Sequence, residues 1–387
     1  MFQIRLYTTI EHSSDKSAIK QYSGCHSGAA IRAHKKDHDS NSLTINNVVA
    51  RSAHNHLWLI LVSAVYVLAS WYVVAHTPQA HFDTSLNSLI WIGVAAPLSI
   101  GLLLSVCFRV VVIQHPPRPL RHLWTEARAL IDKQQIASGL LVLFLLSPMI
   151  FYFSQIKSLI PYLNPQDWDT TFARLDTWIA GGRHPYEYLD ALLNWPWLYR
   201  LLSHFYHDLW VVVCFGVIAH VAFATRESFE KSRFLLSYFL CWILIGSVFA
   251  IAFNSGGPIF FHDYTSLGTY DPLVAQLRRL AGSDETGAYG LAQMLAGFRS
   301  PIVAPPPGMG ISAMPSMHVS MAFLVFLHFR KKTRFARVLV TLFAGMIFVL
   351  SVALGWHYVV DGLAAILLTT GIWWLAGWMV RSQPVRY

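Results

Sequence analysis

Charged side chains are scarce in this sequence: Asp, Glu, Lys and Arg make up only 13% of its 387 residues. A soluble domain carries about 25%, whereas hydrophobic residues reach 55% of this chain. The composition therefore excludes an ordinary soluble protein and indicates an integral membrane protein. The 14 tryptophans fit that class, because indole rings collect at the boundary between lipid and water.

Cysteine is also rare. The four cysteines show no paired spacing, and three of them lie inside apolar segments: Cys25, Cys107, Cys214 and Cys241. Such a pattern is typical neither of a disulfide framework nor of a metal site. We therefore expect no disulfide, no metal and no cofactor.

Long apolar runs, in contrast, are abundant. Runs that could cross a bilayer, which takes about 20 residues, lie at 56–76, 88–108, 137–156, 206–224, 234–253, 317–329, 336–354 and 358–380. The sixth run is short, but Pro315 and Ser316 form a good helix start before it. The sequence thus predicts an all-α, polytopic membrane bundle of about eight spans.

The chain divides into three parts. Residues 1–50 are polar and lack the apolar core of a secretory signal, so we expect a mostly disordered cytoplasmic tail. Residues 51–135 hold two additional spans and a basic loop. Residues 136–380 form the six-span core.

Basic residues indicate how the chain crosses the membrane. They concentrate in the loops 109–133, 226–233 and 330–337, which all fall on the same side as the two tails. By the positive-inside rule that side is cytoplasmic. The net charge of +9 thus reflects topology, and we expect no nucleic-acid partner. We expect a multi-pass protein of the bacterial inner membrane, with its N-terminus in the cytoplasm.

Two short motifs open on the opposite, extracytoplasmic face. His318 begins the sixth span, and His357 and Asp361 begin the eighth. His357 and Asp361 are four residues apart and share a helix face. The carboxylate can hold the Nδ1 proton, which leaves Nε2 free to attack phosphorus. His318 could then protonate the leaving oxygen, so the pattern favours phosphoryl chemistry.

Candidate phosphate-binding groups lie near these histidines. Ser316 offers a hydroxyl at a helix N-terminus, which attracts anions, and Arg299 is a nearby cation. The amides of Gly256 and Gly257 could approach a phosphate, although such a pair is usually a turn. Arg278–Arg279 fits a solvated charge pair better than a binding site.

Two long outer loops, 157–205 and 254–316, surround these motifs. The first is rich in Trp, Pro and Tyr and could lie in the membrane interface as short amphipathic helices. The second is long enough to form a lid or substrate-binding wall. His204, His207 and Asp208 could suggest a metal cluster, but without a further ligand pattern polar anchoring fits them better.

These motifs resemble the type 2 phosphatidic acid phosphatase superfamily, whose members include six-helix membrane enzymes that work through a phosphohistidine without a metal. Residues 315–318 match its motif P-S-x-H, and residues 355–361 match its motif G-x-H-x-x-x-D. The resemblance implies that His357 is the nucleophile and Asp361 orients it. It also implies that His318 acts first as acid and then as base, on a lipid phosphate or phospholipid.

The chain departs from the family pattern at its basic residues. A Lys followed seven residues later by Arg-Pro is absent where the first motif should lie, and Leu350 and Ser351 replace the Ser-Arg of the third. The inositol phosphorylceramide synthases depart similarly, and Ser255–Pro258, Asp167–Pro185 and Gly355–Tyr358 look like their motifs. This branch implies transfer of a phosphorylated head group as well as hydrolysis.

An alternative function is a transporter that uses the intramembrane histidines as a proton or substrate site. The sequence shows no paired inverted repeats and no broken helices in matching positions, which disfavours a transporter. The oligomeric state stays open.

Overall fold

A computed structural model describes residues 45–80, 100, 103, 133–298 and 304–382. The chain divides into two units, residues 1–48 and 49–387. Helix α2 (Ile45–Asn55) begins inside the segment expected to be a disordered tail. Throughout the described ranges the regular secondary structure is helical, without a strand.

Six helices in the described ranges are long and apolar enough to cross a membrane. They are α3 (Leu57–His76), α6 (Lys133–Leu163), the composite helices Pro196–Ala224 and Phe229–Ala252, α16 (Arg334–Ala353) and α17 (Val359–Arg381). The shorter α15 (Met317–Phe329) is the predicted sixth run. The prediction of a polytopic helical bundle is confirmed, while the predicted span at 88–108 lies outside the described residues.

Both composite helices contain π-helical turns. The first consists of α8 (Pro196–His204), the π turn η4 (Phe205–Leu209), α9 (Trp210–Ala219) and the π turn η5 (His220–Ala224). The second consists of α10 (Phe229–Leu240), η6 (Cys241–Phe249) and α11 (Ala250–Ala252). Single π turns inside α-helices are frequently found at functional sites.

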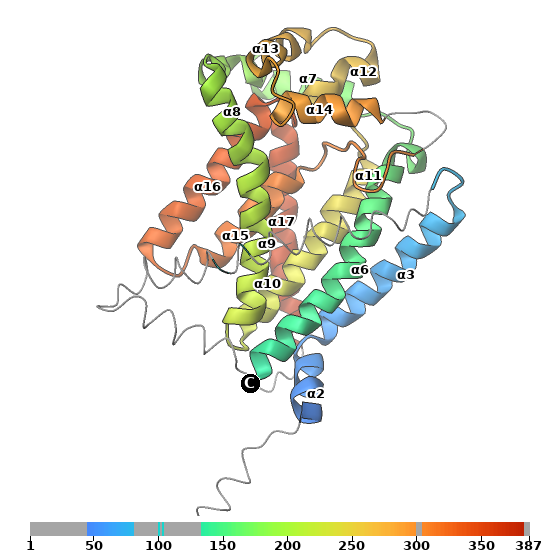
Figure 1. The fold of residues 1–387 in the computed structure, drawn as a ribbon, viewed down its shortest axis with the longest axis vertical. Coiled ribbons are helices and arrows are strands. Elements are labelled where there is room, and N and C mark those ends of the chain that lie inside the picture. Colours follow the sequence, from blue (N-terminus) through green and yellow to red (C-terminus); the bar gives the residue numbers. More distant parts are fainter. Residues whose placement is uncertain (1–44, 81–99, 101–102, 104–132, 299–303, 383–387) are drawn as a thin grey trace, which may run out of the picture. The chain divides into compact units, whose positions relative to one another are not determined.

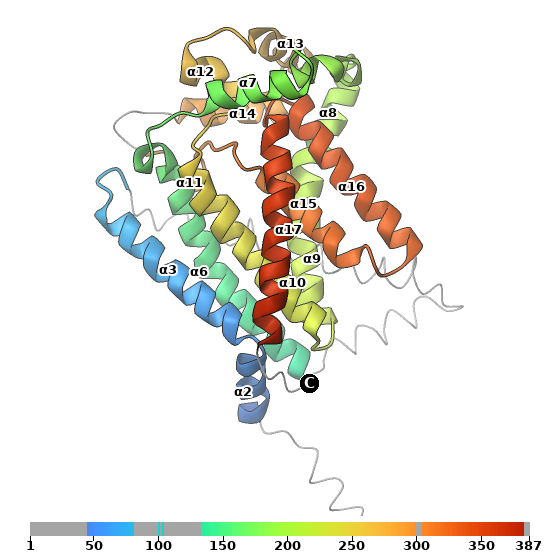
Figure 2. The same ribbon diagram turned by 180° about the vertical axis from the view of Figure 1, so that it is seen from behind.

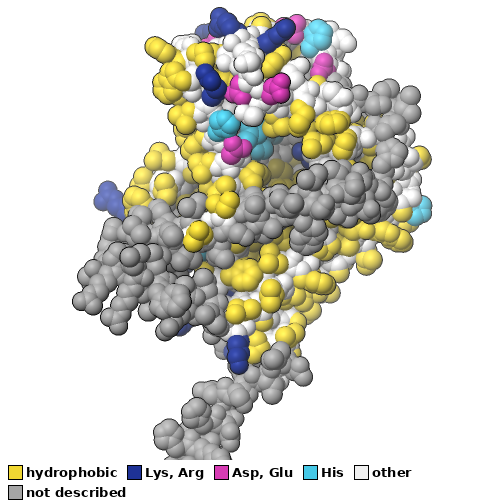
Figure 3. Space-filling view, viewed as in Figure 1, with side chains coloured by type: hydrophobic (Ala, Val, Ile, Leu, Met, Phe, Trp, Pro, Cys, Tyr) yellow, Lys and Arg dark blue, Asp and Glu magenta, His cyan; other side chains and the backbone are white. Residues whose placement is uncertain are grey.

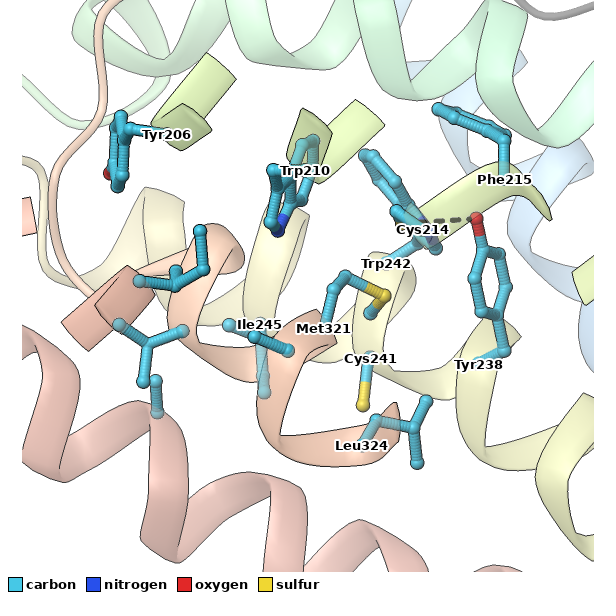
Figure 4. Close-up of a cluster of buried hydrophobic side chains, with 14 of the residues drawn as sticks. Tyr206, Trp210, Cys214, Phe215, Tyr238, Cys241, Trp242, Ile245, Met321 and Leu324 are labelled. Atoms are coloured by element: carbon cyan, nitrogen blue, oxygen red, sulfur yellow. Dashed lines mark hydrogen bonds between the residues drawn. The ribbon is translucent and has the colours of Figure 1, made fainter. Parts of the chain in front are cut away.

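The core of the bundle lies between α9, α10 with η6, and α15. Figure 4 shows Trp210, Tyr238, Trp242 and Met321 converging there, with Cys241 beside them. All five are buried. The Tyr238 hydroxyl lies 3.4 Å from the Cys214 sulfur, which gives it a partner inside an otherwise apolar cluster. Packing of this kind fixes α15, and with it the position of His318.

Short helices cover the end of the bundle at which α17 begins (Figures 1 and 2). They are α7 (Asp169–Ile179), η2 (Pro185–Tyr188), η3 (Asp190–Leu193), η7 (Pro258–Phe260), α12 (Phe261–Thr265), α13 (Asp271–Ala281) and α14 (Ala288–Gly297). We call this set the cap. It is built from the two long outer loops that the sequence places beside the motifs.

Helix α7 in the cap is amphipathic, with acidic side chains on its buried face and apolar side chains on its exposed face. Its buried face carries Asp169 and Asp176, whereas Leu175, Trp178 and Ile179 are exposed, Trp178 by 79%. Exposed apolar side chains on a short helix fit a position in the interface between lipid and water. The two carboxylates therefore point into the protein and the apolar side chains point away from it.

The opposite end of the bundle holds a buried ionic cluster. The ammonium of Lys231 donates to the carbonyls of Ala222 and Thr225 and pairs with Glu227 at 2.9 Å. Glu227 also lies 3.4 Å from His56, which precedes α3. Burial alone would raise the pKa of Glu227, but the bond to His56 and the charge of Lys231 lower it to about 2. The cluster links α3 to the core.

Candidate active site

His357 and Asp361 form a buried pair at the start of α17. The Nδ1 atom of His357 lies 3.3 Å from Oδ2 of Asp361, and both side chains are buried. The same carboxylate oxygen accepts the amide of Tyr358 at 3.0 Å. The amide of Ser316 donates to the Asp361 carbonyl at 3.3 Å, so the two sequence motifs are joined directly.

His318, in the first turn of α15, faces this pair. Its ring centroid lies 6.2 Å from that of His357. Tyr206 stacks on it at 4.4 Å and Trp210 packs on it at 4.2 Å. The Trp210 indole also donates to the His318 carbonyl at 3.0 Å. The rings of two separate helices are thus held close enough for one phosphoryl group to reach both.

Asp169 in the cap holds the backbone around the histidine pair. Its carboxylate accepts the amides of Gly256 at 2.6 Å and Gly257 at 2.8 Å, and the Tyr358 hydroxyl at 2.6 Å. Burial, together with the neighbouring carboxylate of Asp167, raises the pKa of Asp169 to about 8. One side chain thus anchors both the glycine turn and the residue that follows His357.

Asp176 caps the N-terminus of α17. Its two oxygens accept the amides of Val359 at 2.8 Å and Val360 at 2.9 Å, which are otherwise unpaired donors of the first turn. Burial raises the pKa of Asp176 to about 7. Sequence reasoning assigned no role to these two aspartates. Their spacing of seven residues on an amphipathic helix, which places both on one face, was the available signal.

Three of the four predicted phosphate-binding groups already have hydrogen-bond partners in the structure. The Gly256 and Gly257 amides are occupied by Asp169, and the Ser316 hydroxyl accepts the Val319 amide as the N-cap of α15. The phosphate role of these groups stays a prediction, and their existing bonds disfavour it. Arg299 lies outside the described residues.

The glycine turn has a clear structural role. The Ser255 carbonyl and hydroxyl accept the amides of Ala313 and Met314, and the Gly355 carbonyl accepts the amide of Ile259. Gly257 has a φ of +86°, and a Cβ there would collide with the carbonyl of Trp356. Residues 255–259 thus connect the segments that lead into both histidine motifs.

Lys157, near the end of α6, is a cation that the sequence reasoning missed. It is half-buried, and its charge acts on His318. Within the described part of the chain its ammonium has no hydrogen bond or ion pair. Seven residues later the sequence reads Asn164-Pro165. A search for the first family motif that allowed Asn in place of Arg would have found it.

The structure separates His207 from His204 and Asp208. His204 and Asp208 form an exposed pair with 2.7 Å between Nδ1 and Oδ2. His207 instead lies with its ring centroid 6.0 Å from that of His318 and 5.2 Å from that of Trp356. In Figure 3, histidine side chains border a hollow beneath the cap. Among the described residues, no three His, Cys, Asp or Glu side chains are arranged to hold a metal ion.

Comparison with known families agrees with this geometry. The model of the PAP2 superfamily matches residues 170–375, which is more than half of the chain and includes both histidine motifs. This chain belongs to the PAP2 superfamily. The predicted superfamily is confirmed, and membership makes the chain a phosphatase-type membrane enzyme that acts on phosphoesters. A search of the curated proteins and of the solved structures finds no match.

Proposed function

We propose that this PAP2 enzyme cleaves the phosphoester of a membrane lipid through a phosphohistidine at His357. The observation that carries the proposal is the buried pair of His357 and Asp361, with the ring of His318 6.2 Å from that of His357. Lys157, on α6, interacts electrostatically with His318. A nucleophile, a group that orients it and an acid thus meet from α17 and α15, and we propose Lys157 of α6 as the cation of the site.

The first half of the reaction follows from the tautomer of His357. The carboxylate of Asp361 accepts a hydrogen bond from Nδ1–H of His357, so Nε2 of His357 carries the lone pair. Nε2 bonds to phosphorus while the bond from phosphorus to the leaving oxygen breaks. His318 gives its proton to that oxygen, and the phosphoryl group stays on His357. Acid catalysis of this kind contributes a factor on the order of 10²–10⁴.

Lys157 supplies positive charge to the phosphoryl oxygens. Charge that develops on these oxygens in the transition state requires a positioned cation. We propose that the ammonium of Lys157, which interacts electrostatically with His318, gives that charge without help from a metal, and that the enzyme is metal-independent. The N-terminus of α15, which begins after Ser316, adds the positive end of a helix dipole near the phosphoryl group.

The place of the site in the bundle supports a lipid substrate and an outward orientation. The histidines lie at the end opposite the basic segments that flank α10 and α16. By the positive-inside rule those segments face the cytoplasm, so the site faces the periplasm or the outside. Residues 136–380 are proposed to form the catalytic core. A bacterial inner membrane stays a prediction.

The acceptor decides between two reactions. Water would make the enzyme a lipid phosphatase, and a lipid or polyol hydroxyl would make it a phosphotransferase like the inositol phosphorylceramide synthases. Both share one phosphoenzyme. The motif at Gly355–Tyr358 and the turn at Ser255–Pro258 resemble those of the synthases. The test therefore includes transfer of the phosphoryl or head group to a hydroxyl acceptor.

The experiment uses purified protein in liposomes with lipid phosphates, prenyl diphosphates and phospholipids, each with and without polyol and lipid acceptors. Inorganic phosphate and new lipids are followed together by mass spectrometry, in the presence and absence of EDTA. We expect turnover that EDTA does not change and His357→Ala abolishes. Turnover lost in EDTA and restored by Mg²⁺ or Zn²⁺ would contradict the mechanism, and no reaction across the panel would favour the transporter.

A further inference from the structure

Three arginines come together at the end of the bundle opposite the histidines. Arg233 lies in the second turn of α10, Arg330 follows the last residue of α15, and Arg381 is the last residue of α17. The three helices pack against one another, and the charges of Arg330 and Arg381 both act on Arg233. We call these residues the arginine cluster. Arg233 lies inside the span Phe229–Ala252, where a charged side chain is rare and usually functional.

The packing of α10 on α17 fixes the guanidinium of Arg233. Its Nε donates to the carbonyl of Trp373 at 3.0 Å, and its central carbon lies 4.1 Å from the centroid of the Trp373 ring. Gly377, one turn later on α17, makes room for it, because a Cβ there would lie 2.9 Å from Nε of Arg233. Within the described residues the two terminal nitrogens of Arg233 form no hydrogen bond. The group is held in place with these donors available to a ligand.

The other two arginines also lack partners for their charge. The guanidinium carbons of Arg233 and Arg381 lie 5.8 and 5.3 Å from the centroid of the Phe229 ring, which both thus share. The Nε of Arg330 is buried without a hydrogen-bond partner. In the part of the chain that the structure describes, no carboxylate forms an ion pair with the cluster, and Glu230, whose charge acts on Arg233, is exposed. The three like charges therefore repel one another in the protein alone.

The chemistry of the cluster suits a phosphate group. The planar fork of a guanidinium matches two phosphate oxygens. The surroundings favour a lipid as the source of that phosphate, because Trp374 and Trp378, next to Trp373 and Gly377 in the sequence, are exposed on α17. Exposed indole rings collect at the boundary between lipid and water. Basic pockets between membrane helices on the cytoplasmic side bind anionic head groups.

We propose that the arginine cluster binds the phosphodiester head group of an anionic phospholipid in the cytoplasmic leaflet. The phosphate bridges Arg233, Arg330 and Arg381, and it thereby joins the ends of α10, α15 and α17. Helices α15 and α17 carry His318 and His357 in the first turn and just before it, at their other ends. The lipid therefore stabilises the helices that hold the active site without touching a reacting group.

The test measures the binding of short-chain phosphatidylglycerol to the delipidated full-length protein in a neutral detergent. The salt concentration is about 0.15 M, at which exposed charges more than about 8 Å apart are largely screened. Native mass spectrometry counts the bound lipid, and thermal unfolding gives the shift in melting temperature. Short-chain phosphatidylcholine, which has no net charge, and glycerol 3-phosphate, which has no acyl chain, are compared with it. We expect only phosphatidylglycerol to bind and to raise the melting temperature.

Two variants separate binding from a structural role. Arg330→Gln and Arg381→Gln should each raise the apparent Kd for phosphatidylglycerol on the order of tenfold, because each removes a charge-assisted hydrogen bond. Without lipid, Arg330→Gln should melt at the wild-type temperature or above it, since repulsion within the cluster falls. Arg337→Gln is the matched control, because it removes an exposed positive charge from α16 at the same end. Its affinity should equal that of the wild type.

Several results would overturn the inference. Equal affinity in the wild type and both cluster variants would place the lipid elsewhere, the active site included. An equal loss in Arg337→Gln would reduce the effect to general surface charge. Competition by glycerol 3-phosphate would make the ligand a soluble phosphate, and a lower melting temperature of lipid-free Arg330→Gln would make that arginine structural.

Discussion

At the residue scale, the proposed chemistry depends on three side chains that perform different tasks. His357→Ala removes the nucleophile and should abolish turnover, and His318→Ala should do the same by removing the acid. Asp361→Asn keeps the nucleophile but no longer fixes its tautomer. Activity should therefore fall on the order of 10²–10⁴-fold without being abolished. Release of phosphate from lipid measures all three, with monodispersity in detergent as the control for folding. Turnover by His357→Ala would exclude it as the nucleophile.

Lys157 offers a second prediction at this scale. Lys157→Met removes the ammonium and keeps the length of the side chain. We expect kcat/KM to fall on the order of 10²–10³-fold, because the lost charge would stabilise the phosphoryl oxygens in the transition state. Lys157→Arg should retain more activity than Lys157→Met. Arg278→Met, which removes an exposed charge from α13, is the matched control. Equal activity of Lys157→Met and this control would contradict the assignment.

At the element scale, α7 fixes the catalytic segment from outside the bundle. Asp176 holds the first turn of α17, and Asp169 holds the turn at Gly256–Gly257 together with Tyr358. Neither carboxylate belongs to the histidine motifs. The helix therefore acts on the reaction only through the backbone that it positions.

Asp176→Asn should lower kcat about tenfold with little change in KM, because a capping bond to α17 is weakened while the cation and histidines remain. Loss of a helix cap also costs about 0.5–2 kcal/mol of stability. Since the pKa of Asp176 is raised to about 7 in the folded protein, its contribution is complete below about pH 4, the unfolded value. It is lost as the pH rises through 7.

The melting temperature of the wild type should therefore fall more steeply from pH 4 to 7 than that of Asp176→Asn. Thermal unfolding of both proteins across that range measures the difference. Asp208→Asn, at an exposed carboxylate outside α7, should show the wild-type slope. Parallel slopes for the wild type and Asp176→Asn would show that this carboxylate does not titrate with folding.

Hydropathy was sufficient to predict the described spans, down to the bounds of α15, because burial in lipid demands continuous apolar runs. Motif spacing was sufficient to select His318, His357 and Asp361 as neighbours. The roles of Asp169 and of the Gly256–Gly257 amides were not predictable, because they depend on which outer loop packs against which. The approach of His207 was hidden as well, since regular helical periodicity does not reveal a π turn.

At the scale of the whole molecule, the ionic cluster of Glu227, Lys231 and His56 joins α3 to the core. Glu227→Gln should leave a buried ammonium without its carboxylate and lower the melting temperature at neutral pH. Because the pKa of Glu227 is lowered to about 2, its contribution is present above about pH 4.5 and is lost as the pH falls to 2. Thermal unfolding at pH 7 measures the effect, with Glu230→Gln as control. An unchanged melting temperature would contradict it.

Orientation in the membrane is a second property of the whole molecule. In a background without native cysteines, Ser283→Cys marks the cap and Lys332→Cys marks the loop before α16; both positions are exposed. An impermeant maleimide should label Ser283→Cys in intact cells and Lys332→Cys only after permeabilisation. The reverse pattern would place the active site in the cytoplasm.

The two faces of α7 have a consequence for how this enzyme is handled. Trp178 and its apolar neighbours are exposed, while the aspartates on the other face hold Tyr358 and the first turn of α17, next to the proposed nucleophile. A lipid surface bound to the exposed face of α7 would then also support the helix that positions α17. We therefore expect a folded preparation that is inactive in a poorly matched detergent to regain activity on reconstitution into a bilayer, without refolding.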